Sequence, residues 1–247
     1  MTNVHGMIRN TEGIVLHTLK YGESSLIARI YTRDMGMQSY LVRGVRKSKS
    51  RNRQMLFQPL TLVNLVAYHK DNKDGLQNIK DISLRHAYRL IPFDIHRTSL
   101  AIFLAEVLSH ALKSQEYNYA LFDFLNTSLL DLDHQQEKLS FFHLLFLLRL
   151  SRFLGFHPRN NRNAVNLFFN LQEGVYQPVF ENEQTCLDAS LSESFYLLVE
   201  ADTADLPHIQ KDHRKMLLKK LIDYYRLHLS GMPEIKSLAV LETVFAG

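Results

Sequence analysis

The spacing of hydrophobic residues along the chain changes near Pro92. Before it, short runs rich in Ile, Val, Leu, Thr and Tyr are separated by the turn sequences "KYGES", "RDMGM" and "DNKDG". Within one run Leu26, Ala28 and Ile30 alternate with the residues between them, and a period of two is typical of a strand with two different faces. The runs predict strands at residues 13–19, 25–32, 38–44, 60–70 and 76–84.

Five such strands with no long helix between them predict a small closed or nearly closed antiparallel barrel. The five-stranded oligonucleotide-binding barrel, or OB-fold, is the commonest barrel that fits this pattern. We therefore predict an OB-fold domain at residues 1–90.

After Pro92 the spacing becomes helical. The first helix is predicted at residues 94–114, with a hydrophobic stripe formed by Ile95, Leu100, Phe103, Leu104, Val107, Leu108 and Ala111. Further helices are predicted at residues 118–133, 136–156, 191–202, 208–231 and 236–245. Asp133 is the expected N-cap of the helix that follows it, and Gly155 and Pro158 are expected to end that helix.

Residues 166–180 predict a hairpin with its turn at Glu173 and Gly174. The predicted fold class is therefore α+β. An N-terminal five-stranded OB-fold barrel is followed, at residues 91–247, by an all-α helical bundle with a small hairpin insertion in an irregular segment at about 159–188.

Composition narrows the choice of function. The 247 residues carry a formal charge of +4, so the placement of the basic residues matters more than their excess. A single cysteine, Cys186, allows neither an internal disulfide nor a four-thiolate metal site. His143, Arg149 and Arg152 interrupt the most apolar stretch, which favours a buried helix over a membrane span. With no signal-peptide pattern at the start, a cytoplasmic, nucleoid-associated protein is expected.

Signals for catalysis and for metal binding are weak. No phosphate-binding glycine-rich loop and no G-x-S-x-G motif is present, and no histidine pair has the spacing of a helical zinc motif. We therefore expect no enzyme activity, no cofactor and no metal.

One segment concentrates positive charge. Six of the 29 basic residues and no acidic residue lie in an eleven-residue window, as Arg43, Arg46, Lys47, Lys49, Arg51 and Arg53. The window follows a predicted strand, so it is expected to form an exposed loop that binds DNA phosphates. A solvated loop that only aids solubility is the plain alternative, and a localisation signal is a weaker one.

Single-stranded nucleic acid also stacks on aromatic side chains. The aromatic residues near the basic window are Tyr21, Tyr31, Tyr40 and Phe57. Alternation places Arg29 and Tyr31 on one face of their strand, so an outward face would make them a DNA-stacking pair. The alternative is that these tyrosines are ordinary barrel residues.

Three segments resemble the RecO family of bacterial recombination mediators along almost the whole chain. They are "TEGIVLHTLKYGESSLIARIYTRDMGMQSYLVRGVRKSKSR" continuing to "LFQPLTLVNLVAY", then "RLSRFLGFHP", and finally "YYRLHLSGMPEIKSLAVL". The resemblance implies a non-enzymatic protein that binds single- and double-stranded DNA and anneals complementary strands. It also implies that the protein acts with RecR and the single-stranded DNA-binding protein to help load RecA at gaps. An RNA-binding OB-fold protein in RNA processing or translation is the alternative.

The resemblance also implies a partner-binding role for Arg149 and Arg152, which lie three residues apart on one helix face. They would anchor the acidic, hydrophobic tail of a partner, although an intramolecular salt bridge explains them equally well. The basic residues Lys211, Arg214, Lys215, Lys219 and Lys220 would extend the DNA surface or form a solvated helix face.

The chain departs from the family at one point. Many members carry a four-cysteine zinc module after the "LGF.P" segment, where this chain has "RNNRN". We therefore expect a zinc-less hairpin that is held by apolar packing alone.

Overall fold

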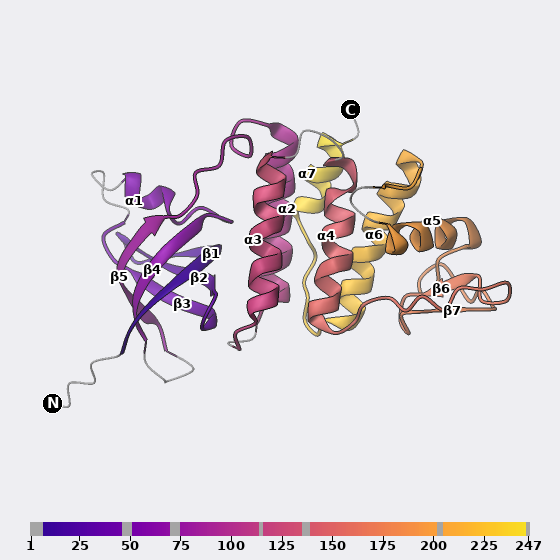
Figure 1. Cartoon of the computed structure of the whole chain (residues 1–247), viewed down its shortest axis with the longest axis horizontal. Helices are drawn as coiled ribbons and strands as arrows, with labels where there is room; N and C mark the ends of the chain where they lie inside the picture. Colours follow the sequence, from indigo (N-terminus) through magenta and orange to yellow (C-terminus); the bar gives the residue numbers. More distant parts are fainter. Residues whose placement is uncertain are drawn as a thin grey trace. The chain divides into compact units, whose positions relative to one another are not determined.

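The computed structural model describes residues 7–45, 51–69, 75–113, 116–134, 139–201 and 205–245, without the side chains of Arg51 and Asn52. The elements, in chain order, are β1 (Met7–Tyr21), β2 (Ser25–Thr32), β3 (Gly36–Val42), α1 (Arg51–Met55), β4 (Leu62–His69), β5 (Gln77–Leu84), α2 (Ile95–Ala111), α3 (Tyr119–His134), α4 (Leu139–Leu154), β6 (Phe168–Asn170), β7 (Val175–Gln177), α5 (Ala189–Glu200), α6 (Lys211–His228) and α7 (Ser237–Val244) (Figure 1).

The packing divides the chain into two compact units. The first contains residues Met1–Gln135 and Ser237–Val244, and the second contains Gln136–Lys236 and Phe245–Gly247. Helices α2, α3 and α7 thus pack as part of the barrel unit, whereas the sequence pattern places its boundary at residue 90. The two units are described separately below.

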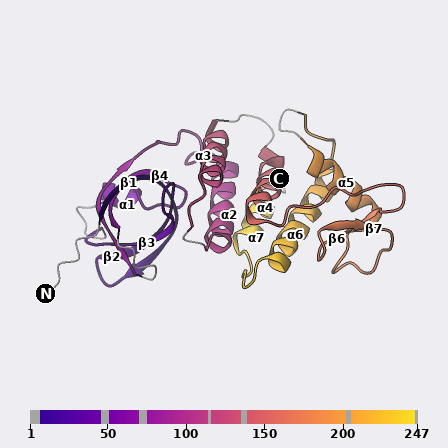
Figure 2. The same ribbon diagram turned by 60° about the horizontal axis from the view of Figure 1, so that its bottom comes forward.

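The first unit is built on a closed barrel with the strand order β1-β2-β3-β5-β4, which confirms the predicted five-stranded barrel (Figure 2). All neighbouring strands are antiparallel except β3 and β5, which are parallel. The barrel core consists of Val15, Leu26, Ala28, Ile30, Tyr40, Val42, Val45, Phe57, Val63, Leu65 and Ala67. The alternating residues Leu26, Ala28 and Ile30 therefore point inward, as their spacing predicts.

The pairing of β1 with β4 closes the barrel, and β1 also pairs with β2. From Met7 to Ile14 it pairs with β4, and from Gly13 to Tyr21 it pairs with β2. Gly13 belongs to both pairings, and a Cβ atom at this position would lie 2.7 Å from Cγ2 of Ile30. Only glycine fits there without displacing a core side chain.

Helices α2 and α3 run side by side, and both contact the barrel (Figures 1 and 2). The buried face of α2 follows the predicted stripe, with Leu100, Phe103, Leu104, Val107 and Leu108 fully buried. The first residue of that stripe is an exception, because the Ile95 side chain is 64% exposed at the start of the helix.

The predicted N-cap role of Asp133 is wrong. Helix α3 continues through it to His134, and the side chain is buried. Its carboxylate instead accepts hydrogen bonds from the backbone N–H groups of Arg89, Leu90 and Ile91, at 2.9–3.0 Å. Burial alone would raise its pKa, but these donors and His86 lower the pKa below its usual value. Asp133 thus attaches the segment between β5 and α2 to α3.

The second unit contains α4, α5, α6 and the hairpin of β6 and β7. The hairpin and its turn confirm the prediction, and Gly174 has a φ of 68°, which favours glycine. Helix α4 is buried on most of its surface, as its composition predicts. None of the helices in the described ranges is long and apolar enough to cross a membrane.

The prediction that apolar packing alone holds the hairpin is wrong, because asparagine side chains also hold it. The Asn161 amide accepts from the backbone N–H of Tyr176 and donates to the carbonyl of Tyr176, at 2.7 and 2.8 Å. Oδ1 of Asn170 and Oδ1 of Asn182 each accept two backbone N–H groups, two and three residues further along. Apolar packing adds to this, since Phe169 and Tyr176 are buried against each other.

The buried histidine of α4 predicts an acid-sensitive second unit. His143 is 5% exposed, and burial together with the nearby Arg214 lowers its pKa to about 3. In the unfolded chain this histidine takes up a proton near pH 6.5, whereas in the folded protein it stays neutral. The free energy of unfolding should therefore be constant above about pH 6.5 and should decrease below it, by about 1.4 kcal/mol per pH unit. Urea unfolding at pH 7.5, 6.5 and 5.5 measures this change. The His143→Leu variant should lose about 1 kcal/mol less than the wild type between pH 6.5 and 5.5; equal losses would contradict the prediction.

Candidate nucleic-acid interface

The basic window lies in the connection from β3 to β4. Arg43 directly follows β3, and the short helix α1 occupies Arg51–Met55, so part of the predicted loop is helical. Arg46, Lys47 and Lys49 lie outside the described residues, and of Arg51 only the backbone is described. The geometry of the window is therefore given by its two ends, Arg43 and Arg53.

Both ends present free positive charge. Arg43 and Arg53 are exposed, and no carboxylate of a described residue lies within ion-pair distance of either. Other barrel arginines differ in this respect. Arg33 pairs with Glu12 and Asp123 at 3.2 and 3.0 Å, and Arg85 pairs with Glu12 at 3.3 Å. Cations without internal partners are the ones that can neutralise phosphates.

The structure does not support an outward stacking pair of Arg29 and Tyr31. Tyr31 is 2% exposed and stacks on Phe122 of α3, with ring centroids 6.3 Å apart. Burial is the larger of two opposing effects and raises the pKa of Tyr31 to about 12. A hydrogen bond with the backbone of Asn118 opposes the rise. Helices α2 and α3 cover this face of β2, so Tyr31 is not available to a base.

Arg29 lies under the same two helices, and its side chain bonds within the barrel unit. Its guanidinium donates to the carbonyls of Ser109 and Leu112 near the end of α2, at 3.2 and 3.4 Å. Cations are favoured at that end of a helix, so the contact is structural. The pKa of the neighbouring His17 is lowered by burial, by Arg29 and by His110.

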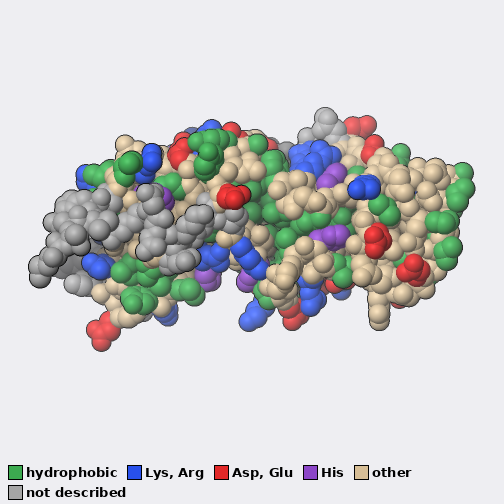
Figure 3. Space-filling view, turned by 90° about the horizontal axis from the view of Figure 1, so that it is seen from below, with side chains coloured by type: hydrophobic (Ala, Val, Ile, Leu, Met, Phe, Trp, Pro, Cys, Tyr) green, Lys and Arg blue, Asp and Glu red, His purple; other side chains and the backbone are tan. Residues whose placement is uncertain are grey.

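Among the four aromatic candidates, only Tyr21 is accessible. Its side chain is 52% exposed at the end of β1, whereas Tyr40 and Phe57 are core residues at 0% and 2% exposure. Leu19, on the same face of β1, is 50% exposed. Figure 3 shows hydrophobic side chains near Lys and Arg on the barrel surface. Single strands bind where aromatic side chains lie beside cations, and Tyr21 is the exposed aromatic residue among the four candidates.

The second unit contains the two arginines predicted to bind a partner. Arg149 is half-buried on α4, and Arg152 is exposed near its end. Nε of Arg152 donates to Nε2 of His157 at 3.2 Å, so that ring nitrogen is unprotonated. The pKa of His157 is lowered by burial and by Arg152, although the Leu148 carbonyl opposes this shift. No acidic side chain within the described ranges forms an ion pair with either arginine.

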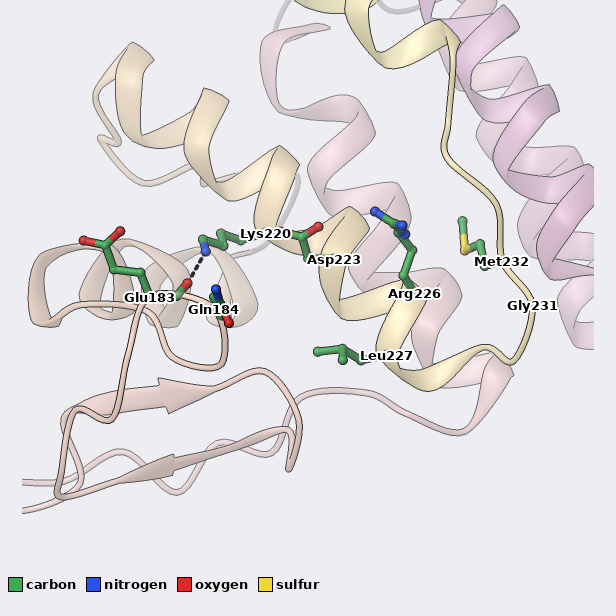
Figure 4. Close-up of a pocket in the computed structure, with 8 residues that line it drawn as sticks. All are labelled: Glu183, Gln184, Lys220, Asp223, Arg226, Leu227, Gly231 and Met232. Atoms are coloured by element: carbon green, nitrogen blue, oxygen red, sulfur yellow. Dashed lines mark hydrogen bonds between the residues drawn. The ribbon is translucent and has the colours of Figure 1, made fainter.

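A cavity of the second unit, about 690 Å³, lies beside α6 (Figure 4). Its lining combines the carboxylates of Glu183 and Asp223 with the cations of Lys220 and Arg226. Nζ of Lys220 donates to the Glu183 carbonyl at 2.5 Å. Because the opposite charges balance, the cavity offers no excess of positive charge to a phosphate chain, and it contains neither Arg149 nor Arg152.

Comparison with known proteins gives matches along the whole chain. The family model "Recombination protein O N terminal" matches residues 7–88, and "Recombination protein O C terminal" matches residues 92–239. The "DNA repair protein RecO" of Flavobacterium psychrophilum is 35% identical over 239 residues, which cover 96% of this chain and 98% of that protein. The proteins of the same name from Phocaeicola vulgatus and Porphyromonas gingivalis are 36% and 31% identical, and each match covers 97% of this chain and 100% of the relative.

The free arginines at the two ends of the window give the prediction for this interface. Arg43→Ala combined with Arg53→Ala should weaken binding of a single-stranded DNA oligonucleotide and should reduce the slope of log affinity against log salt by roughly 1.5, since each phosphate contact contributes about 0.7 to 0.9. Tyr31→Phe should leave both quantities unchanged, because that side chain is buried. Fluorescence anisotropy across a salt series measures them. An unchanged slope in the arginine variant would show that these side chains do not contact phosphate.

Proposed function

This chain belongs to the RecO family of DNA repair and recombination proteins, and from that membership we propose that it is a recombination mediator that anneals complementary DNA strands without catalysis. It binds single- and double-stranded DNA through the barrel. With RecR it helps to load RecA onto gaps covered by the single-stranded DNA-binding protein. The observation that carries this proposal is the pair of exposed arginines, without partners among the described residues, at the ends of the basic window of an OB-like barrel.

The proposed mechanism is electrostatic. Pairing of complementary strands is favourable in itself, but two phosphate backbones repel each other as they approach. A dense group of cations lowers that repulsion when it neutralises phosphates of both strands, and it needs no nucleotide to do so. The window supplies such a group, because its six cations lie in a single connection between two barrel strands.

Strand annealing by the full-length protein tests the mechanism. A variant with Arg46, Lys47, Lys49 and Arg51 changed to Ala should anneal complementary oligonucleotides much more slowly than the wild type. Its DNA affinity should depend less steeply on salt, with a log–log slope smaller by roughly 3 for four lost contacts.

A matched variant controls for net charge. Changing Lys211, Lys215, Lys219 and Arg226 of α6 to Ala removes the same number of cations from the exposed surface of a helix in the second unit. It should anneal at the wild-type rate. If both variants lose annealing activity equally, the DNA site lies outside the window or extends to α6. If the window variant anneals at the wild-type rate, the mechanism is refuted. Stronger binding of RNA than of DNA of matched sequence would instead favour the RNA-processing alternative.

We further propose that Arg149 and Arg152 bind the acidic tail of the single-stranded DNA-binding protein. One N–H of the Arg152 guanidinium is used by His157, and its other donors remain for a carboxylate. Most apolar side chains of α4 are buried, so the contribution of this helix to the contact would be its two cations.

Binding of a labelled C-terminal peptide of the single-stranded DNA-binding protein measures this contact. Loss of one charge-assisted hydrogen bond costs about 1.5 to 3 kcal/mol, so Arg152→Ala should weaken peptide binding by roughly 10- to 100-fold. Arg226→Ala removes an exposed arginine of the same unit and should have no effect. If Arg149→Ala and Arg152→Ala both bind the peptide as well as the wild type, the tail binds elsewhere.

A further inference from the structure

Three potential metal ligands that are distant in sequence come together in the barrel unit. His86 follows β5, whereas Asp133 and His134 end α3. One ligand atom from each side chain lies within 4.8 Å of the other two, and the two imidazole centroids are 5.9 Å apart. Sequence spacing gave no indication of this cluster, because a strand end and a helix end more than forty residues apart supply its members.

The spacing of the ligand atoms fits a shared ion better than a hydrogen bond. Nε2 of His86 is buried and has no hydrogen-bond partner among the described residues. It lies 3.6 Å from Oδ2 of Asp133, beyond normal hydrogen-bond distance. Two ligand atoms bound to one tetrahedral zinc ion at about 2.1 Å lie about 3.4 Å apart. The observed separation is close to that value.

The surrounding hydrogen bonds orient the ligands. Three backbone N–H groups hold the Asp133 carboxylate in place. Nδ1 of His134 lies 2.7 Å from the Leu130 carbonyl, so the proton belongs on Nδ1 and the lone pair of Nε2 is open. A histidine whose other nitrogen donates to a carbonyl is the usual arrangement in metal sites. His134 is exposed, so an ion from solvent can reach its ring.

We propose that His86, Asp133 and His134 form a binding site for a divalent transition-metal ion. Two imidazoles and one carboxylate, without a thiolate, suit zinc and its first-row neighbours, and water would complete a tetrahedral site. The bound ion would connect the end of β5 to the end of α3, next to the segment that Asp133 already holds. This site is independent of the DNA-binding proposal.

Metal binding by the full-length chain tests the site. Protein stripped with a chelator and dialysed against Zn²⁺ should retain one ion at this site, and Zn²⁺ should raise its thermal unfolding temperature, because an ion that binds only the folded state stabilises it. His134→Asn should reduce the Zn²⁺ affinity by at least about tenfold, since even changes outside the ligand set cost that much. His134 is exposed, so this variant should keep the wild-type circular dichroism spectrum.

Two further variants make the outcome decisive. His86→Asn should reduce the affinity as His134→Asn does, whereas His208→Asn removes an exposed histidine of the second unit and should bind Zn²⁺ as the wild type does. Equal Zn²⁺ affinity in the wild type, His86→Asn and His134→Asn would overturn the proposal. So would a wild type that binds no ion and shows no thermal shift, in which case His86 and Asp133 interact only through a proton.

Discussion

The pairing of β1 with β4 is the constraint on which the barrel depends. A five-stranded sheet closes only if the strands at its two ends pair with each other, and β1 does this over Met7–Ile14, while Gly13–Tyr21 pairs with β2. The crossover falls at Gly13, where any side chain would displace Ile30 from the core. The closing contacts also include a short parallel pairing of β3 with β5, at Tyr40 and Leu41, and the connection to β4 begins two residues later, at Arg43. The basic window is part of that connection.

The sequence pattern identified the elements well but did not show which faces are covered. Alternation in β2 correctly placed Leu26, Ala28 and Ile30 inside, because a period of two separates two faces. It could not reveal that α2 and α3 pack on the second face, so Tyr31 looked available and is buried. Asp133 was misassigned for a similar reason: a local rule for helix starts cannot anticipate that a distant backbone segment supplies its partners. Both errors concern contacts between elements far apart in the sequence.

Polar side chains as well as apolar ones hold the hairpin of the second unit. The sequence predicted correctly that a hairpin forms around Gly174, but apolar residues are only part of its support. Oδ1 atoms of Asn170 and Asn182 accept backbone N–H groups in the loops, and Asn161 bonds to both backbone polar groups of Tyr176. An asparagine side chain satisfies loop N–H groups without an ion, because its carbonyl oxygen is a neutral acceptor that can be held close to the backbone. Local hydrogen bonds therefore hold this segment together with apolar packing.

The positions of the helices also determine which barrel cations are paired within the protein. Strands β2 and β3 pair from Leu26 and Val42 at one end to Thr32 and Gly36 at the other. Helices α2 and α3 cover Arg29 at the middle of β2 and Tyr31 near the second end, and Arg33 pairs with Asp123 of α3 just beyond that end. Arg43 follows β3 at the first end, six residues beyond the partner of Tyr31, Met37, which is roughly 20 Å at about 3.4 Å per residue. The same residue type thus has two roles in one sheet: near the helices an arginine stabilises the fold, and at the uncovered end it remains available to a phosphate backbone.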